Sequence, residues 1–224
     1  WTRFTDDTLS SDSVEVNWRI STDTSMINIV NSGNGYAHIN SDWTFKVDAS
    51  GLSPDTWYYY DFEALGYHSI RGRTKTAPLG DNDSARFAVV SCSNYEHGYF
   101  NVYRYLRNRN DFDAVLHLGD YIYEYEAGGY SAGIVDRDNE PINEIITLED
   151  YRVRYSHYRL DDDLRSLHQQ YPFINVWDDH ESANDSYVDG AQNHSPSTEG
   201  LWSDRKSNAT QAYHEWLPIR SPIP

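Results

Sequence analysis

The sequence contains one cysteine, one methionine and few basic side chains. Because Cys92 stands alone, no disulfide bond can form within the chain. No apolar run approaches the ~18 residues that a membrane-spanning helix requires. Lys and Arg number 18 against 35 Asp and Glu, and the formal net charge of −17 disfavours nucleic acid or an anionic membrane surface as the main partner. The excess of acid suits cation binding and an extracellular protein, so we expect a secreted or periplasmic location.

Residues 1–78 have the pattern of an all-β domain. Four segments are typical of strands, because apolar and polar residues alternate or aromatic residues accumulate: residues 14–20, 43–47, 57–62 and 69–76. Turn-forming residues at 31–35 (NSGNG) and 51–55 (GLSPD) separate them. Short strands at this spacing predict a β-sandwich. The polar residues 79–85 are predicted to be a linker.

From residue 86 onward, strands alternate with helices. Apolar strands are predicted at 86–90, 113–118 and 173–177, the last two of them buried. Apolar residues at helical spacing, or capping residues, predict helices at 99–106, 147–158, 161–170 and 209–216, the last ended by Pro218. Strands and helices in alternation predict an α/β domain with a largely parallel sheet.

Reactive side chains follow all three predicted strands. SCSN (91–94) follows the first, GDYIYE (119–124) the second and DDHE (178–181) the third, with Asn184 and Asp185 close behind. In open α/β sheets, ligands bind beyond the carboxyl ends of the strands. Thiol, carboxylate, phenol, imidazole and amide groups are metal ligands, and clustered carboxylates repel one another unless a cation lies between them. The sequence therefore predicts a metal site at this edge of the sheet.

Each motif alone has a structural explanation. A Gly-Asp pair after a strand is usually a turn, an isolated cysteine is commonly a small buried residue, and Tyr123 could serve packing alone. His117 lies within a strand and is predicted to be a core histidine with satisfied hydrogen bonds. Asp161, Asp162 and Asp163 are predicted to begin a helix and to carry no chemistry. WDDHE (177–181) is too dense in ionisable groups for such a reading, and the joint pattern over three strand ends favours function.

These motifs resemble a known family. SCSN, LHLGDYIYE (116–124) and WDDHE, in this order and spacing, look like those of the PhoD-like alkaline phosphatases and phospholipases D of the metallophosphoesterase superfamily. GLSPDTWYYYDFEALGYHSIRGRTKTAP (51–78) resembles the N-terminal immunoglobulin- or fibronectin-like domain of that family. The resemblance implies such a β domain over residues 1–78, and the first half of a metallophosphoesterase catalytic domain over residues 86–224.

The resemblance also implies a site with one Fe(III) and two Ca(II) ions, at which a metal-activated water hydrolyses phosphate esters. Carried over by position, Cys92 and Tyr123 would bind iron, Asp120 would bridge iron and calcium, and Asn184 would bind calcium. The Asp-x-x-Tyr spacing of Asp120 and Tyr123 resembles that of purple acid phosphatases, in which a phenolate holds Fe(III). Soft thiolate and phenolate ligands favour iron, whereas carboxylate and amide oxygens favour calcium.

Asp179, His180 and Glu181 fall where the wider superfamily has Asn-His-Glu or Asn-His-Asp. Asp178 and Asp179 are candidate ligands or groups close to the metals, and His180 is a candidate for contacting the phosphate. We assign Asp178 to the metals, and Asp179 and His180 to catalysis. The first strand of the wider superfamily usually ends in Asp-x-His. Here it ends in Ser-Cys-Ser (91–93), which disfavours an ordinary two-zinc or two-manganese site.

Two alternatives remain open from the sequence. One is a phospholipase D that acts on phospholipid head groups at the same site. The other is a non-catalytic, calcium-stabilised secreted binding module, which would leave Cys92 and Tyr123 unexplained. The family also has a later Gly-Asp-x-His motif that completes the metal set. We find none between residues 185 and 224. We therefore expect the missing half of the catalytic domain to be present, as a second polypeptide packed against this one.

Overall fold

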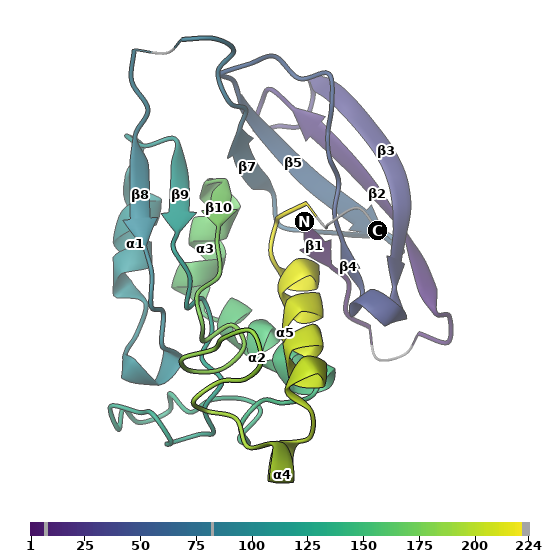
Figure 1. Ribbon diagram of the computed structural model, residues 1–224. Helices are drawn as coiled ribbons and strands as arrows, with labels where there is room; N and C mark the ends of the chain where they lie inside the picture. The colour runs from purple at the N-terminus through teal and green to yellow at the C-terminus, as the bar shows by residue number, and fades with distance from the viewer. Residues whose placement is uncertain (7–8, 82, 221–224) are drawn as a thin grey trace. The chain divides into compact units, whose positions relative to one another are not determined.

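The computed structural model describes residues 1–6, 9–81 and 83–220 (Figure 1). The chain divides into two compact units. The first comprises Trp1–Phe87, Asn110–Ala114 and His168–Pro172, and the second comprises Ala88–Arg109, Val115–Leu167 and the chain from Phe173 onward. The predicted linker at 79–85 includes residue 82, which lies outside the described residues.

The first unit is built on a five-stranded antiparallel sheet. Its strands are β2 (Ser13–Ser21), β3 (Ile29–His38), β5 (Trp57–Ala64), β6 (Tyr67–His68) and β7 (Gly72–Lys75). They lie in the order β3-β2-β5-β6, and β7 also pairs with β5. A separate antiparallel pair joins β1 (Thr2–Arg3) to β4 (Thr44–Phe45). A short 3-10 turn, Ile39–Ser41, follows β3.

Alternating side chains of β2 and β5 form the core of this unit. Val14, Val16, Phe62 and Ala64 are buried together, because every second residue of a strand points to the same face. Aromatic residues, among them Trp18 and Phe45 and Tyr60, pack against this cluster. The strands predicted at 14–20 and 57–62 are thus confirmed, whereas those at 43–47 and 69–76 are shorter than predicted.

The turn predicted at 31–35 is wrong, because these residues lie inside β3. A Cβ atom on Gly33 would lie 2.9 Å from Nε1 of Trp18, and one on Gly35 would lie 2.5 Å from Cε2 of Phe45. The two glycines therefore let aromatic rings lie directly on the strand, which is a recognised use of glycine within a sheet.

The second unit carries a three-stranded sheet in the order β10-β9-β8. The strands are β8 (Phe87–Val90), β9 (Ala114–His117) and β10 (Phe173–Asn175). β10 pairs in parallel with β9, with Ile174 opposite Leu116, and the arrowheads of β8 and β9 point the same way in Figure 1. The carboxyl ends of the strands therefore lie at one edge, as predicted from the alternation of strands and helices.

One face of this sheet is uncovered in the described part of the chain. Phe87 and Val89 on β8 are 48% and 59% exposed, and Ile174 on β10 is 54% exposed. Ala88, Val115 and Phe173, which point to the opposite face, are buried. The strand predicted at 173–177 was expected to be buried, but it is shorter than predicted, and among the described residues only one of its faces is covered.

Six helical segments accompany the second sheet: η2 (Tyr95–His97), α1 (Asn101–Asn108), α2 (Leu148–Arg159), α3 (Asp162–Gln170), α4 (Pro196–Glu199) and α5 (Trp202–Trp216). A capping box between Thr147 and Asp150 begins α2, as the sequence predicts. The Asp161 carboxylate accepts two backbone amides at the start of α3, which confirms its predicted capping role.

Helices α2 and α5 pack against each other through buried aromatic and charged side chains. Tyr155 is fully buried and stacks on Trp216, with ring centroids 6.3 Å apart. Arg152 and Glu215 form a two-bond ion pair at 2.7 and 2.8 Å. None of the helices in the described part of the chain has the length and apolar character that crossing a membrane requires.

Candidate metal centre

The segments that follow β8 and β9 are joined by backbone hydrogen bonds. The amide of Cys92 donates to the carbonyl of Gly119 (3.2 Å), and the amide of Ser93 donates to the carbonyl of Asp120 (2.8 Å). Cys92 (φ 58°) and Asp120 (φ 52°) both have left-handed backbone, which is uncommon outside glycine. Backbone strain of this kind clusters at functional sites, so both positions are candidates for a chemical role.

His117 lies under this junction and is a core residue, as predicted. It is 1% exposed, its Nε2 lies 3.1 Å from the hydroxyl of Ser93, and its Nδ1 accepts the amide of Gly119 at 3.4 Å. Burial lowers the pKa of His117 to about 4, so it is neutral at physiological pH. It supports the loops and carries no charge to the site.

Glu181, the last residue of WDDHE, joins the second loop to the third. Its side chain is fully buried. Oε2 accepts the amides of Asp120 (3.1 Å) and Asp178 (2.8 Å), and Oε1 accepts the amide of Tyr121 (2.7 Å). One carboxylate therefore fixes the distance between the ends of β9 and β10. This role of Glu181 was not predicted from the sequence.

Gly119 marks the closest approach of these two loops. A Cβ atom there would lie 2.5 Å from the backbone nitrogen of Asp178, and the φ of +106° is one that side chains rarely adopt. The glycine that looked like an ordinary turn residue is thus required for the strand ends to meet.

Three ligand-type side chains converge where the loops meet. The donor atoms of Asp120, Asp179 and His180 lie within 4.8 Å of one another. Asp120 and His180 are 6% and 8% exposed. Burial raises the pKa of Asp120, and the nearby carboxylates of Asp179 and Asp178 raise it further, although His180 and a hydrogen bond with Cys92 act in the opposite direction. A cation at this point would relieve the repulsion among the acids, so the residues fit a metal ion.

Tyr123 and Cys92 lie beside this group. The hydroxyl of Tyr123 donates to Oδ2 of Asp120 at 3.3 Å, and its ring stacks on that of His180 with centroids 4.2 Å apart. Burial raises the pKa of Tyr123 far above its usual value, and the charges of Asp120 and Cys92 add to the effect. The phenol therefore keeps its proton unless a metal ion displaces it.

Asp178 is not among the three ligand-type side chains that converge, and the contacts of Asn184 are with neighbouring polar groups. Asp178 is exposed and acts on Asp120 through its charge. The side-chain amide of Asn184 donates to Oε1 of Gln192 (2.9 Å), and its backbone amide donates to Glu124 (2.7 Å). The roles assigned to both residues as metal ligands stay predictions.

Glu124 is a second buried acid, and its role was not predicted from the sequence. It is 0% exposed, and its Oε2 lies 2.7 Å from Nδ1 of His180. Its Oε1 accepts from the backbone amide of Asn184 and from the side chain of Asn193. Burial would lower the pKa of His180, but Glu124, Asp120 and Asp179 outweigh it and raise that pKa. An acid within so aromatic a stretch (121–125) could have been recognised from the sequence as a functional candidate, because such a stretch is expected to be buried and a buried acid needs a partner.

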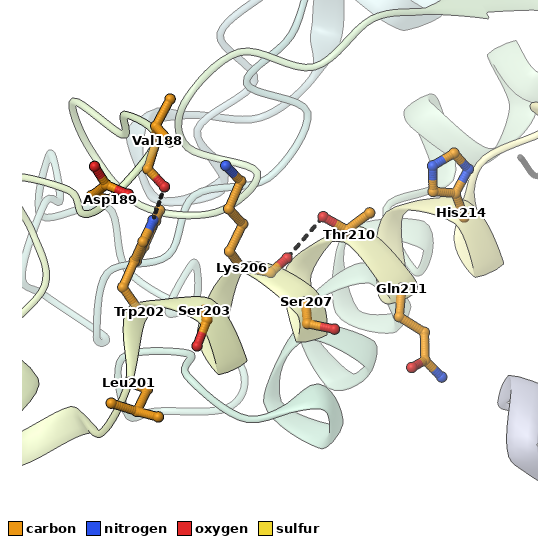
Figure 2. Close-up of a pocket in the computed structure, with 10 residues that line it drawn as sticks. All are labelled: Val188, Asp189, Leu201, Trp202, Ser203, Lys206, Ser207, Thr210, Gln211 and His214. Atoms are coloured by element: carbon orange, nitrogen blue, oxygen red, sulfur yellow. Dashed lines mark hydrogen bonds between the residues drawn. The ribbon is translucent and has the colours of Figure 1, made fainter.

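A separate hollow of about 720 Å³ lies along α5 (Figure 2). Its lining runs from Val188 and Asp189 over Trp202 to His214, and includes none of the candidate metal ligands. The indole N–H of Trp202 donates to the carbonyl of Val188 at 3.3 Å on one side of it. The hollow is distinct from the metal centre.

Comparison with known proteins agrees with this geometry. Residues 87–224 match the family model described as PhoD-like phosphatase, and residues 1–78 match the model of the N-terminal domain of PhoD-like phosphatases. The chain belongs to the PhoD-like phosphatase family. The resemblance drawn from SCSN, LHLGDYIYE and WDDHE is thereby confirmed.

Two relatives are much longer than this chain. The chain is 37% identical over 227 residues to alkaline phosphatase D of Bacillus subtilis (strain 168), covering 98% of this chain and 38% of the relative. It also matches a solved structure titled "Structure of PhoD" with a TM-score of 0.90 and 35% identity, covering 98% of this chain and 43% of the other. The fold is therefore PhoD-like, and the chain spans less than half the length of these relatives.

Proposed function

We propose that this chain forms part of the active site of a metal-dependent phosphoric ester hydrolase, a PhoD-like alkaline phosphatase acting on monoesters, diesters or both. The observation that carries the proposal is the convergence of Asp120, Asp179 and His180 within 4.8 Å at the carboxyl ends of parallel strands. The relative named alkaline phosphatase D supports the reaction class.

The proposed metals are one Fe(III) and two Ca(II). Cys92 and Tyr123 would hold the iron, Asp120 would bridge iron and calcium, and Asn184 and Asp178 would complete the ligands from this chain. The hydrogen bonds of Asp120 with Tyr123 and Cys92 support this grouping. Bound there, the metals would neutralise phosphate oxygens and lower the pKa of an attacking water.

His180 is proposed to contact the phosphate. Glu124 holds Nδ1 of its imidazole at 2.7 Å, which fixes the ring and favours its protonated form. A protonated imidazole donates to a phosphate oxygen and opposes the net charge of the surrounding acids. Asp179 presents His180, because its carbonyl accepts the amides of Ser182 (2.8 Å) and Ala183 (2.9 Å) in the turn that carries the histidine.

Several finer features belong to the same proposal. Residues 1–78 would form the immunoglobulin- or fibronectin-like sandwich, residues 79–85 the linker and residues 86–224 the first half of a metallophosphoesterase domain. The exposed side chains of Phe87, Val89 and Ile174 support the idea that a further part of the catalytic domain covers this face of the sheet. A secreted location is proposed from the charge of −17.

The test compares Asp179→Asn with Asp162→Asn. Both remove one negative charge, but the carboxylate of Asp162 is 85% exposed and pairs with Arg165 at the start of α3. Metal content and hydrolysis of nitrophenyl phosphate and bis-nitrophenyl phosphate would be measured for both variants. We expect Asp179→Asn alone to lose at least ~100-fold in kcat, and a loss of metal as well would identify its carboxylate as a further ligand. Equal activity in the two variants would contradict the proposed site.

The same measurements, with a phospholipid added as a third substrate, separate the alternatives. A phospholipase D would release the head group of a phospholipid faster than it hydrolyses either nitrophenyl ester. A calcium-stabilised binding module would bind calcium, contain no iron and hydrolyse none of the three substrates.

A further inference from the structure

Aromatic rings continue outward from the metal centre. Next to Tyr123 and His180 lies Tyr125, whose ring centroid is 5.6 Å from that of His180. Tyr130 follows, with its ring centroid 5.2 Å from Tyr125 and 6.1 Å from Tyr123, and His97 lies 4.5 Å beyond it. We call His97, Tyr125 and Tyr130 the aromatic wall.

The wall is held on an anchored backbone. Glu96 is 1% exposed, and its carboxylate accepts the backbone amides of Gly128 (3.1 Å) and Asn139 (3.0 Å). The side-chain amide of Asn94 donates to the carbonyl of Tyr130 at 3.2 Å, while its Oδ1 accepts the amide of Glu96 at 2.9 Å. A buried carboxylate and a buried amide thus fix the loop that presents Tyr130, so that its position exists before any ligand arrives.

The outer part of the aromatic wall is open to solvent, whereas the ring of Tyr123, between the wall and Asp120, is not. Tyr130 is 46% exposed and His97 is exposed, but Tyr123 is only 6% exposed. A core aromatic buries its faces and contributes to stability through that burial. A half-exposed ring on an anchored loop, in contact with other rings, instead offers a surface on which a planar group can stack.

We propose that the aromatic wall is a subsite for the organic group that is attached to the phosphate of the substrate. The wall prefers an organic group with a planar aromatic ring, such as an aryl group or a nucleobase. The inference rests on the proposed function. It places the phosphate of the substrate at Asp120, Asp179 and His180, and the attached organic group toward Tyr130. Stacking on tyrosine rings suits an otherwise strongly acidic protein, because it binds the organic group of the ester without requiring a positive charge.

The experiment removes the aromatic ring either from the protein, by substitution of Tyr130, or from the ligand, by use of an aliphatic phosphate ester. Tyr130→Ala, Tyr130→Phe and Tyr105→Ala would be made in the metal-loaded enzyme. Tyr105 is the matched control, since it is 62% exposed on α1 and contacts Arg109 rather than the wall. Each variant would be assayed for kcat/KM on phenyl phosphate and on glycerol phosphate, and for binding of phenylphosphonate and methylphosphonate by calorimetry.

We expect Tyr130→Ala to lose about 3- to 10-fold in kcat/KM on phenyl phosphate through KM, and the same factor in phenylphosphonate affinity. Glycerol phosphate and methylphosphonate should be unaffected, Tyr130→Phe should resemble the wild type, and Tyr105→Ala should change nothing. An equal effect on the aromatic and aliphatic ligands, or no effect, would overturn the subsite. If neither ester is hydrolysed by the wild type, the proposed function fails, while the two phosphonates still test the wall.

Discussion

Replacing Glu181 with glutamine should alter how the stability of the metal-free protein depends on pH. Burial raises the pKa of Glu181 to about 7 from its usual 4.5, despite the backbone amides of Tyr121, Asp178 and Asp120 that it accepts. The folded protein therefore keeps this proton in a pH range where the unfolded chain has lost it. The contribution to stability is fully present below about pH 4.5 and is lost as the pH rises to about 7.

The size of the effect follows from that difference. At about 1.4 kcal/mol per pH unit, the interval from 4.5 to about 7 corresponds to about 3 kcal/mol of unfolding free energy. Glutamine cannot lose a proton, but its NH₂ group cannot accept the backbone amides that one oxygen of Glu181 accepts, so the variant also has a loss of stability that does not depend on pH. Relative to the wild type, Glu181→Gln should thus gain about 3 kcal/mol between about pH 4.5 and pH 8.

The assay is urea unfolding in the presence of a chelator at several pH values across this interval. Glu149→Gln is the matched control, because it makes the same substitution at a glutamate that is exposed in the first turn of α2. Restoring the metals should flatten the wild-type profile, since cations close to Glu181 favour its charged form. A difference between Glu181→Gln and wild type that is constant with pH would refute the argument from burial.

Four further outcomes test the site. Asp120→Asn should lose metal and essentially all hydrolysis, and near-native turnover of an aryl phosphate would mean that the site lies elsewhere. Cys92→Ala should lose iron, and with it the visible absorption that the thiolate of Cys92 and the phenolate of Tyr123 give when they bind Fe(III). An unchanged metal content and an unchanged spectrum would contradict iron ligation. A calcium-selective chelator should abolish activity and added calcium should restore it, if Asn184 helps to hold calcium. Glu124→Gln should lower kcat by about 10- to 100-fold through the misplaced His180, with measured metal content showing whether ligation is affected as well.

The candidate site was predictable from the sequence where strand order alone decides the geometry. Parallel strands bring their carboxyl ends to one edge, so segments far apart in the chain, containing Cys92, Asp120 and His180, had to meet there. The capping box at Thr147 was also predictable, because both of its partners lie within one helical turn and no tertiary contact is needed to form it.

Features that depend on tertiary neighbours were not predictable in this way. The glycines of β3 looked like a turn because nothing local reveals that Gly33 lies on Trp18 and Gly35 on Phe45. Glu124 and Glu181 were counted among the acids at the strand ends, but their structural roles were not predictable, since their partners are an imidazole from another loop and backbone amides that any residue could offer. No sequence motif marks Tyr130, because its proposed role depends on a loop that is anchored by residues from other parts of the chain.

The left-handed backbone at Cys92 and Asp120 has a consequence for how such a protein can evolve. A side chain in this conformation costs on the order of 1 kcal/mol, a cost that glycine avoids. Selection for heat resistance alone would therefore favour glycine at the two positions where the proposed chemistry can least accept it. Laboratory evolution that screens only for stability should therefore drift toward robust but inactive descendants.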